Sequence, residues 1–225
     1  MKPKILTLSR LHAEIYLPKK ADPRSVFYAL TAVPPAFSQL PELNTFHTAL
    51  VILTGMDWER DLPPWNAPPL YPDEPPFLGG ADFFLSQLLT NTIPTIEARY
   101  QLPQKDRVLI GVSLAGLFAA YTACRSDAFP RIASISGSLW YDGFVQFLTR
   151  QPPRPSLRAA YFSLGRKEKN SRLMRLASIE NATIQTVQQF KSCGIETTFE
   201  LNPGTHFTDI PLRIRKAITW LGENG

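Results

Sequence analysis

The feature that most constrains this chain is Ser113, which lies between an apolar run and a helical pattern within residues 107–116. These patterns predict a buried strand that turns at once into a helix. Such a turn strains its central residue and needs small residues two positions before and after it, here Gly111 and Ala115. Ser113 is therefore the candidate nucleophile, on the turn called a nucleophile elbow. A serine that only caps the helix is the alternative.

The remaining pattern alternates strands and helices, which favours an α/β fold with a mostly parallel central sheet and helices on both faces. We expect strands at residues 13–18, in an antiparallel hairpin at the sheet edge, and at 48–53, 131–136, 157–164 and 197–201. We expect helices at residues 81–100, with a kink at Pro94, and at 144–148, 173–190 and 211–221. The 225 residues suffice for one such domain, which we expect to span residues 1–225.

Residues 62–76 contain seven prolines and can form neither a helix nor an interior strand. An interdomain linker is one interpretation of such a segment. The aromatic residues in it and beside it are too many for a solvated linker, and they are Trp58, Trp65, Tyr71 and Phe77. We therefore expect a loop that packs over the edge of the sheet and lines a pocket.

The composition argues against several classes of protein. The formal charge of +5 comes from scattered basic residues without an aromatic-rich basic stripe, so we expect no nucleic-acid partner. No apolar stretch approaches the ~20 residues of a membrane span, and residues 1–20 lack the apolar core of a secretory signal. We therefore expect a cytoplasmic protein without a membrane partner. We expect Cys124 and Cys193 to be reduced core thiols, and neither has metal-ligand spacing.

A serine hydroxyl needs a base within hydrogen-bonding reach before it can attack an ester. The chain has three histidines, and His12 and His47 lie where a partly exposed polar residue needs no special role. His206 lies in a turn between the last expected strand and the last expected helix. This position is typical of the base in hydrolases with a nucleophile elbow, and a surface or capping histidine is the alternative.

The acid that orients the imidazole should follow a strand between the serine and the histidine. Glu168 is the leading candidate, because it comes shortly after a strand that ends at Gly165. Its basic neighbours leave open an ordinary solvated charge at this position. Asp142, at the end of the preceding strand, and Asp209, just after the histidine, are the fallback candidates.

Acyl transfer also needs two backbone N–H groups that point at the developing oxyanion. One belongs to Leu114, directly after the candidate nucleophile. The other should come from the loop after strand 48–53, where Gly55 allows a tight turn and Met56 supplies the N–H. The candidates for an acyl or aromatic pocket, with core or loop packing as the alternative, are Trp58, Trp65, Trp140 and Tyr141.

Several segments occur in an order that is typical of one enzyme family. They are GMDW at 55–58, RDLPPW at 60–65, GGADFFL at 79–85, IPTIE at 93–97, GVSLAG at 111–116, SGSLWY at 136–141 and GRKE at 165–168. Together they resemble the putative-esterase branch of the α/β-hydrolases, which includes enterobactin- and salmochelin-type siderophore esterases, S-formylglutathione hydrolases and mycolyltransferases. The siderophore-esterase group is the most similar, chiefly through residues 79–82 and 138–140. The resemblance covers residues 48–208.

This resemblance implies an α/β-hydrolase fold and a serine esterase that acts on small-molecule esters, with no metal or organic cofactor. It implies Ser113, His206 and Glu168 in the triad positions. Two features depart from the family pattern: Ala115 replaces the usual Gly, and the segment before Thr48 is short and lacks matching features. A thioesterase or acyltransferase with the same machinery, and a catalytically silent binding protein, are the alternative functions.

Overall fold

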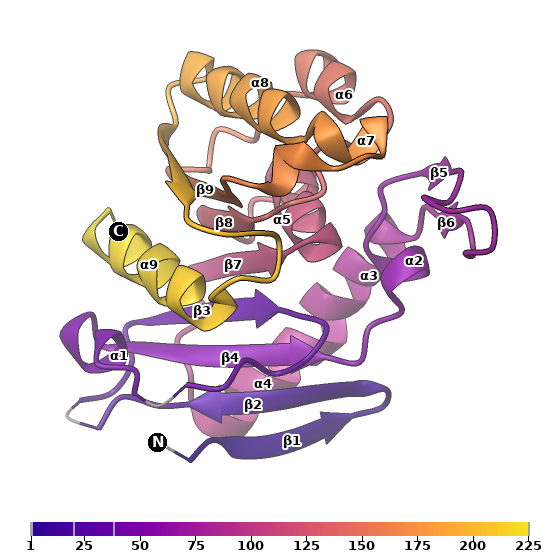
Figure 1. Cartoon of the computed structure of the whole chain (residues 1–225). Coiled ribbons are helices and arrows are strands. Elements are labelled where there is room, and N and C mark those ends of the chain that lie inside the picture. The colour runs from indigo at the N-terminus through magenta and orange to yellow at the C-terminus, as the bar shows by residue number, and fades with distance from the viewer. Residues whose placement is uncertain (1, 20, 38, 225) are drawn as a thin grey trace.

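The computed structural model, which describes residues 2–19, 21–37 and 39–224, is built around an eight-stranded sheet (Figure 1). In spatial order the strands are β1 (Lys4–Leu8), β2 (Leu11–Tyr16), β4 (Thr48–Thr54), β3 (Ser25–Leu30), β7 (Arg107–Val112), β8 (Arg131–Ile135), β9 (Ala159–Gly165) and β10 (Glu196–Asn202). β2 pairs antiparallel with β1 and β4, and every pair from β4 to β10 is parallel. The mostly parallel sheet, with an antiparallel hairpin at its edge, is confirmed.

Helices cover both faces of this sheet (Figure 1). One face packs against α1 (Glu42–Thr45) and α9 (Ile210–Glu223). The other packs against α3 (Ala81–Gln87), α4 (Ile93–Tyr100), α5 (Leu114–Arg125), α6 (Phe144–Arg150) and α8 (Ile179–Ser192). The shorter elements are α2 (Trp58–Asp61), the paired strands β5 (Asn66–Ala67) and β6 (Phe77–Leu78), the 3₁₀ turn η2 (Glu168–Asn170) and α7 (Met174–Ala177).

The central strands are buried on both sides, because each face of the sheet carries its own apolar core. Along β4, Ala49, Val51 and Leu53 belong to the core on the α5 side. Leu50 and Ile52 belong to the core on the α9 side. Successive side chains of a strand alternate between the two faces, so a strand with two buried faces reads as an unbroken apolar run.

The sequence patterns do not predict β3, although it lies inside the sheet between β4 and β7. Its six residues, SVFYAL, are all buried. The run is short and has no period of its own, and a segment of a buried helix gives the same signal. Burial on both faces, which makes β4 recognisable, is therefore not enough to identify every such strand.

Two of the expected helices are interrupted. The expected helix at residues 173–190 divides at Ser178 into α7 and α8. The expected helix at residues 81–100 contains a π-helical turn, η1 (Leu88–Thr92), just before Pro94. In a regular α-helix the proline ring would clash with the carbonyl group four residues earlier, and a wider turn relieves this clash.

The two cysteines differ in exposure. Cys124 is buried in α5, whereas Cys193 is exposed after the last residue of α8, so the expectation of two core thiols is wrong for Cys193. Gly194 ends that helix at the surface with a φ of 79°. Within the described ranges, every helix is too short or too polar to span a bilayer.

Candidate active site

Ser113 lies at the turn between β7 and α5. Its backbone has a φ of 61° and a ψ of −126°, a conformation that residues with a side chain rarely adopt. Two backbone hydrogen bonds hold this turn: the N–H of Ser113 donates to the carbonyl oxygen of Ile135, and the N–H of Ser138 donates to that of Ser113, each at 3.0 Å. The surrounding structure thus fixes the strained residue.

The requirement for a small residue before the serine has a direct steric cause. A Cβ atom at Gly111 would lie 1.8 Å from the carbonyl oxygen of Ala115, far inside contact distance. The first turn of α5 therefore passes directly over the end of β7. On the other side of the serine, Ala115 is fully buried, so its methyl group is accommodated where the family pattern has glycine.

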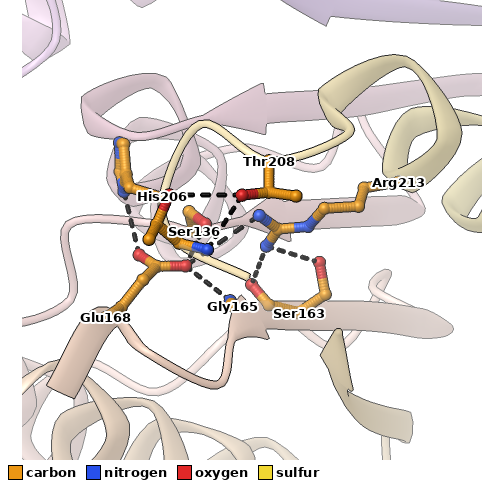
Figure 2. A network of polar contacts seen from close by, with 8 residues as sticks. Ser136, Ser163, Gly165, Glu168, His206, Thr208 and Arg213 are labelled. Atoms are coloured by element: carbon orange, nitrogen blue, oxygen red, sulfur yellow. Dashed lines mark hydrogen bonds and ion pairs between the residues drawn. The ribbon is translucent and has the colours of Figure 1, made fainter. Parts of the chain in front are cut away.

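Glu168 and His206 approach each other from two different connections of the sheet (Figure 2). Glu168 begins η2, shortly after β9, and His206 lies between β10 and α9. The imidazole Nδ1 is 2.8 Å from Oε2 of Glu168. The Glu168 side chain is only 6% exposed, so it is not a solvated charge. Because an ionised carboxylate only accepts hydrogen bonds, we assign the proton to Nδ1, which leaves Nε2 free to accept.

The other carboxylate oxygen of Glu168 is hydrogen-bonded as well. Oε1 accepts from the hydroxyl of Ser136, just after β8, and from the N–H of Gly165, each at 2.5 Å. Burial by itself raises the pKa of Glu168, but the hydrogen bonds from His206, Ser136 and Gly165 outweigh it and lower the pKa below its usual value. The carboxylate is therefore ionised at neutral pH. The contact of Ser136 with Glu168 depends on the pairing of β8 with β9, so no local sequence pattern indicates it.

Ser113, Glu168 and His206 line a single cavity of about 730 Å³. This volume lies within the range of small-molecule binding sites. The proline-rich segment contributes Leu70, Tyr71, Glu74 and Pro75 to the wall, so the prediction that this segment lines a pocket is confirmed. Further apolar lining residues are Trp58, Phe77, Trp140, Leu176 and Ile179.

Of the four aromatic candidates, Trp58 and Trp140 line this cavity, whereas Trp65 and Tyr141 are not among its lining residues. Nε1 of Trp65 donates to the carbonyl oxygen of Asp142 at 2.9 Å, and the Tyr141 hydroxyl donates to the carbonyl oxygen of Trp65. The centroids of the Trp65 and Tyr141 rings are 5.9 Å apart. These contacts fasten the proline-rich segment to the loop after β8, which favours a packing role for this pair.

Arg175 of α7 links separate parts of the cavity wall. Its Nη1 donates to the carbonyl oxygens of Pro68 and Pro69, at 3.1 and 3.0 Å. Its guanidinium lies 5.2 Å from the ring centroid of Trp140 and pairs with Asp142 at 3.0 Å. Asp142, a fallback candidate for the acid, thus contacts this arginine.

Among residues 2–19, 21–37 and 39–224, Glu168 is the carboxylate that contacts His206. Asp209, the other fallback candidate, precedes α9 with a φ of 50°. His12 contacts Thr7 at 3.4 Å, and in the described part of the chain neither it nor His47 lines the cavity. No three His, Cys, Asp or Glu side chains of the described residues gather closely enough to hold a metal ion.

The two candidate oxyanion amides are differently placed. Leu114 is the first residue of α5 and lines the cavity. Met56 follows Gly55, where the chain turns after β4 with a φ of 87°, and is not among the lining residues. Neither amide N–H donates to another backbone group within the described ranges. The N–H of Leu114 is therefore a candidate oxyanion donor at the cavity, whereas that of Met56 lacks a backbone acceptor but does not lie on the cavity wall.

Comparison with known proteins gives the family of this chain. The sequence profile of the Putative esterase family matches residues 9–207, so the chain belongs to this family. A curated relative, "Uncharacterized protein YbbA" of Bacillus subtilis (strain 168), is 29% identical over 167 residues, which cover 71% of this chain and 64% of that protein. The chain thus matches less than two thirds of the length of this relative.

Solved structures share the fold at low sequence identity. An IroE-like serine hydrolase from Shewanella oneidensis has a TM-score of 0.75 and 17% identity, over 99% of this chain and 80% of that chain. The siderophore hydrolase EstA from Aspergillus nidulans has a TM-score of 0.68 and 16% identity, over 95% of this chain and 90% of that chain. The expected α/β-hydrolase fold and the resemblance to the putative-esterase branch are confirmed.

The steric account of the elbow predicts that Gly111→Ala is at least about 2 kcal/mol more destabilising than Gly194→Ala, since overpacking here must displace the backbone of α5. At Gly194 an added Cβ meets nothing within 4 Å, so only the positive φ opposes it. Urea denaturation of the two variants measures the difference. Similar unfolding midpoints would contradict the close approach of β7 and α5.

Proposed function

We propose that the protein is a serine esterase that hydrolyses carboxylic esters of small molecules through a Ser113–His206–Glu168 triad. The observation that carries this proposal is the 2.8 Å contact between buried Glu168 and His206 in a cavity that the strained Ser113 also lines. A nucleophile, a base and an acid that orients the base are the groups that acyl transfer requires. Membership of the Putative esterase family supports the same reaction.

In the first half of the proposed reaction, Oγ of Ser113 attacks the ester carbonyl carbon while Nε2 of His206 takes the hydroxyl proton. Glu168 accepts the hydrogen bond from Nδ1 throughout and stabilises the imidazolium that forms. The tetrahedral intermediate then collapses and the bond to the alcohol breaks. The imidazolium protonates the departing alcohol, and the acyl group remains on Ser113.

In the second half, water attacks the acyl-enzyme while His206 accepts a proton from it. The second tetrahedral intermediate releases the acid, and the imidazolium returns the proton to Oγ of Ser113. The oxyanion that forms in each half accepts hydrogen bonds from the N–H groups of Leu114 and Met56. Each such donor stabilises the transition state by about 3 kcal/mol.

Fluorophosphonate labelling tests the nucleophile. Wild-type protein should be labelled at Ser113, because an oriented base makes this hydroxyl reactive. Ser113→Ala should abolish both labelling and ester hydrolysis, and Ser138→Ala, which changes another serine that lines the cavity, is the control. Wild-type labelling and turnover in the Ser113→Ala variant would assign the nucleophile elsewhere.

His206→Ala should lower kcat by at least ~10³-fold, in line with loss of a triad base, while the far-ultraviolet circular dichroism stays unchanged. His12→Ala and His47→Ala are the matched controls and should remain active. An equal loss in His47→Ala would identify a different base.

Glu168→Gln should keep the fold and lose most of kcat, because the amide group can stabilise the wrong imidazole tautomer. Asp142→Asn and Asp209→Asn provide the comparison and should have mild effects on kcat. A near-normal Glu168→Gln enzyme together with an inactive aspartate variant would transfer the role of acid to that aspartate. Activity in all three variants would indicate a Ser–His dyad.

The cavity supports substrates with an apolar or aromatic group, since the rings of Trp58, Phe77 and Trp140 line it. One structurally similar protein is a siderophore hydrolase, and we include siderophore-type esters in the proposal. A panel of p-nitrophenyl esters, acyl thioesters and catechol–serine esters tests it, with the oxygen esters expected to react fastest. Faster thioester cleavage, or acyl transfer to an added alcohol in place of hydrolysis, would favour the thioesterase or acyltransferase alternative.

A further inference from the structure

A buried arginine lies beside the carboxylate of the proposed triad (Figure 2). Arg213 belongs to α9, and its side chain is 1% exposed. Nη2 donates to the carbonyl oxygen and to the hydroxyl of Ser163 in β9, at 3.0 and 3.2 Å. Nη1 lies 3.9 Å from Oε1 of Glu168, whereas His206 contacts Oε2. The carboxylate thus lies between a fixed cation and the imidazole.

Hydrogen bonding alone does not account for the burial of Arg213. Among the described residues, its Nε and Nη1 atoms have no hydrogen-bond acceptor. Burial lowers the pKa of Arg213, and the negative charges of Glu168 and Glu200 oppose this effect. A guanidinium nevertheless stays protonated at neutral pH. A buried cation with unpaired donors is destabilising, and the charge that compensates it most directly is the Glu168 carboxylate.

We propose that Arg213 is a positioning residue whose charge keeps Glu168 ionised and keeps the His206 imidazole neutral until Ser113 gives up its proton. This inference rests on the proposed esterase function, in which Glu168 and His206 act as a pair. Arg213 is not among the residues that line the cavity in the described part of the chain, and it acts through the carboxylate.

The direction of the effect follows from the charges. Without Arg213, a proton added to the Glu168–His206 pair would remove an uncompensated buried negative charge, so the pair would bind that proton readily. With a guanidinium 3.9 Å from the carboxylate, the negative charge is already balanced, and an added proton creates net positive charge. Arg213 therefore shifts protonation of the pair to lower pH. This widens the pH range in which Nε2 can act as the base.

The other charged groups around this pair differ from Arg213 in their exposure or their partners. Glu200 of β10 pairs with Lys216 of α9 and accepts a hydrogen bond from Tyr161 of β9. The charged side chains that line the cavity or flank His206 and η2 are Glu59, Glu74, Arg166, Lys167, Lys169, Glu180 and Asp209. In contrast, Arg213 is fully buried within ion-pair distance of the carboxylate.

The test compares Arg213→Met, which removes the charge and keeps an apolar side chain of similar length, with Arg213→Lys, which keeps the charge. Arg215→Met is the matched control, because it removes the same charge two residues later on α9, where Arg215 pairs with Glu42 at 2.8 Å. NMR titration of the His206 ring, assigned with His206→Gln, gives the protonation midpoint without any substrate. The acid limb of the kcat/KM profile follows the same proton during turnover.

Arg213→Met should raise the protonation midpoint by about one pH unit. At pH values below both midpoints, its kcat/KM should therefore be roughly tenfold lower than that of the wild type. Arg213→Lys should lower the unfolding temperature but change the midpoint by less than about 0.3 pH units, because the charge is retained. Arg215→Met should leave the midpoint unchanged. If Arg213→Met does not fold, Arg213→Gln, whose amide can still donate to Ser163, replaces it with the same expected shift.

An unchanged protonation midpoint in Arg213→Met, or in Arg213→Gln where that variant replaces it, would overturn the proposal. A shift of the midpoint by a full pH unit in Arg213→Lys would overturn it as well. The titration also separates this inference from the proposed function. A midpoint shift without ester hydrolysis by the wild type would overturn the esterase function alone. Ester hydrolysis by the wild type without a midpoint shift in the neutral variant would overturn the role of Arg213 alone.

Discussion

The geometry of the site depends on one close approach, between Gly111 at the end of β7 and Ala115 in the first turn of α5. A Cβ atom at Gly111 would lie 1.8 Å from the Ala115 carbonyl oxygen, so the strand can turn into the helix only without a side chain there. The turn fixes Ser113 at a positive φ, directly before the N-terminus of α5. Parallel strands end at one edge of a sheet, and the turns after β8, β9 and β10 bring the remaining polar groups to this edge.

The polar groups at this edge of the sheet contact helices from both of its faces. The candidate nucleophile Ser113 directly precedes α5, which packs on one face, while Arg213 approaches the carboxylate from α9, which packs on the other. Glu168 can remain ionised at 6% exposure because both its oxygens accept hydrogen bonds and a cation lies nearby. The site therefore depends on helices from both faces of the sheet, because the candidate nucleophile precedes α5 and the cation near Glu168 belongs to α9.

Local patterns made much of the fold and of the candidate site predictable. The run before Ser113 and the small residues around it are visible in ten consecutive positions, and His206 is marked by its place between the last strand and the last helix. Chain order favours Glu168 as the acid, but its contact with His206 was not predictable, because the two residues are 38 positions apart and meet only through the pairing of β9 with β10. The position of Arg213 does have a signal in the sequence. It shares the buried face of α9 with Ile214, Ala217 and Ile218, and an arginine in an apolar stripe indicates a buried charge.

The walls of the cavity and its reactive groups come from different parts of the architecture. The candidate triad residues lie on the connections that follow β7, β9 and β10, where the register of the sheet positions them. The proline-rich segment supplies four residues of the wall and α7 supplies Leu176; both segments lie outside the eight-stranded sheet and are joined to each other through Arg175. Replacing or lengthening either wall segment would reshape the cavity without altering strand register. In such a scaffold, changes in the least regular segments would alter which molecules fit the cavity while the candidate triad stays in place.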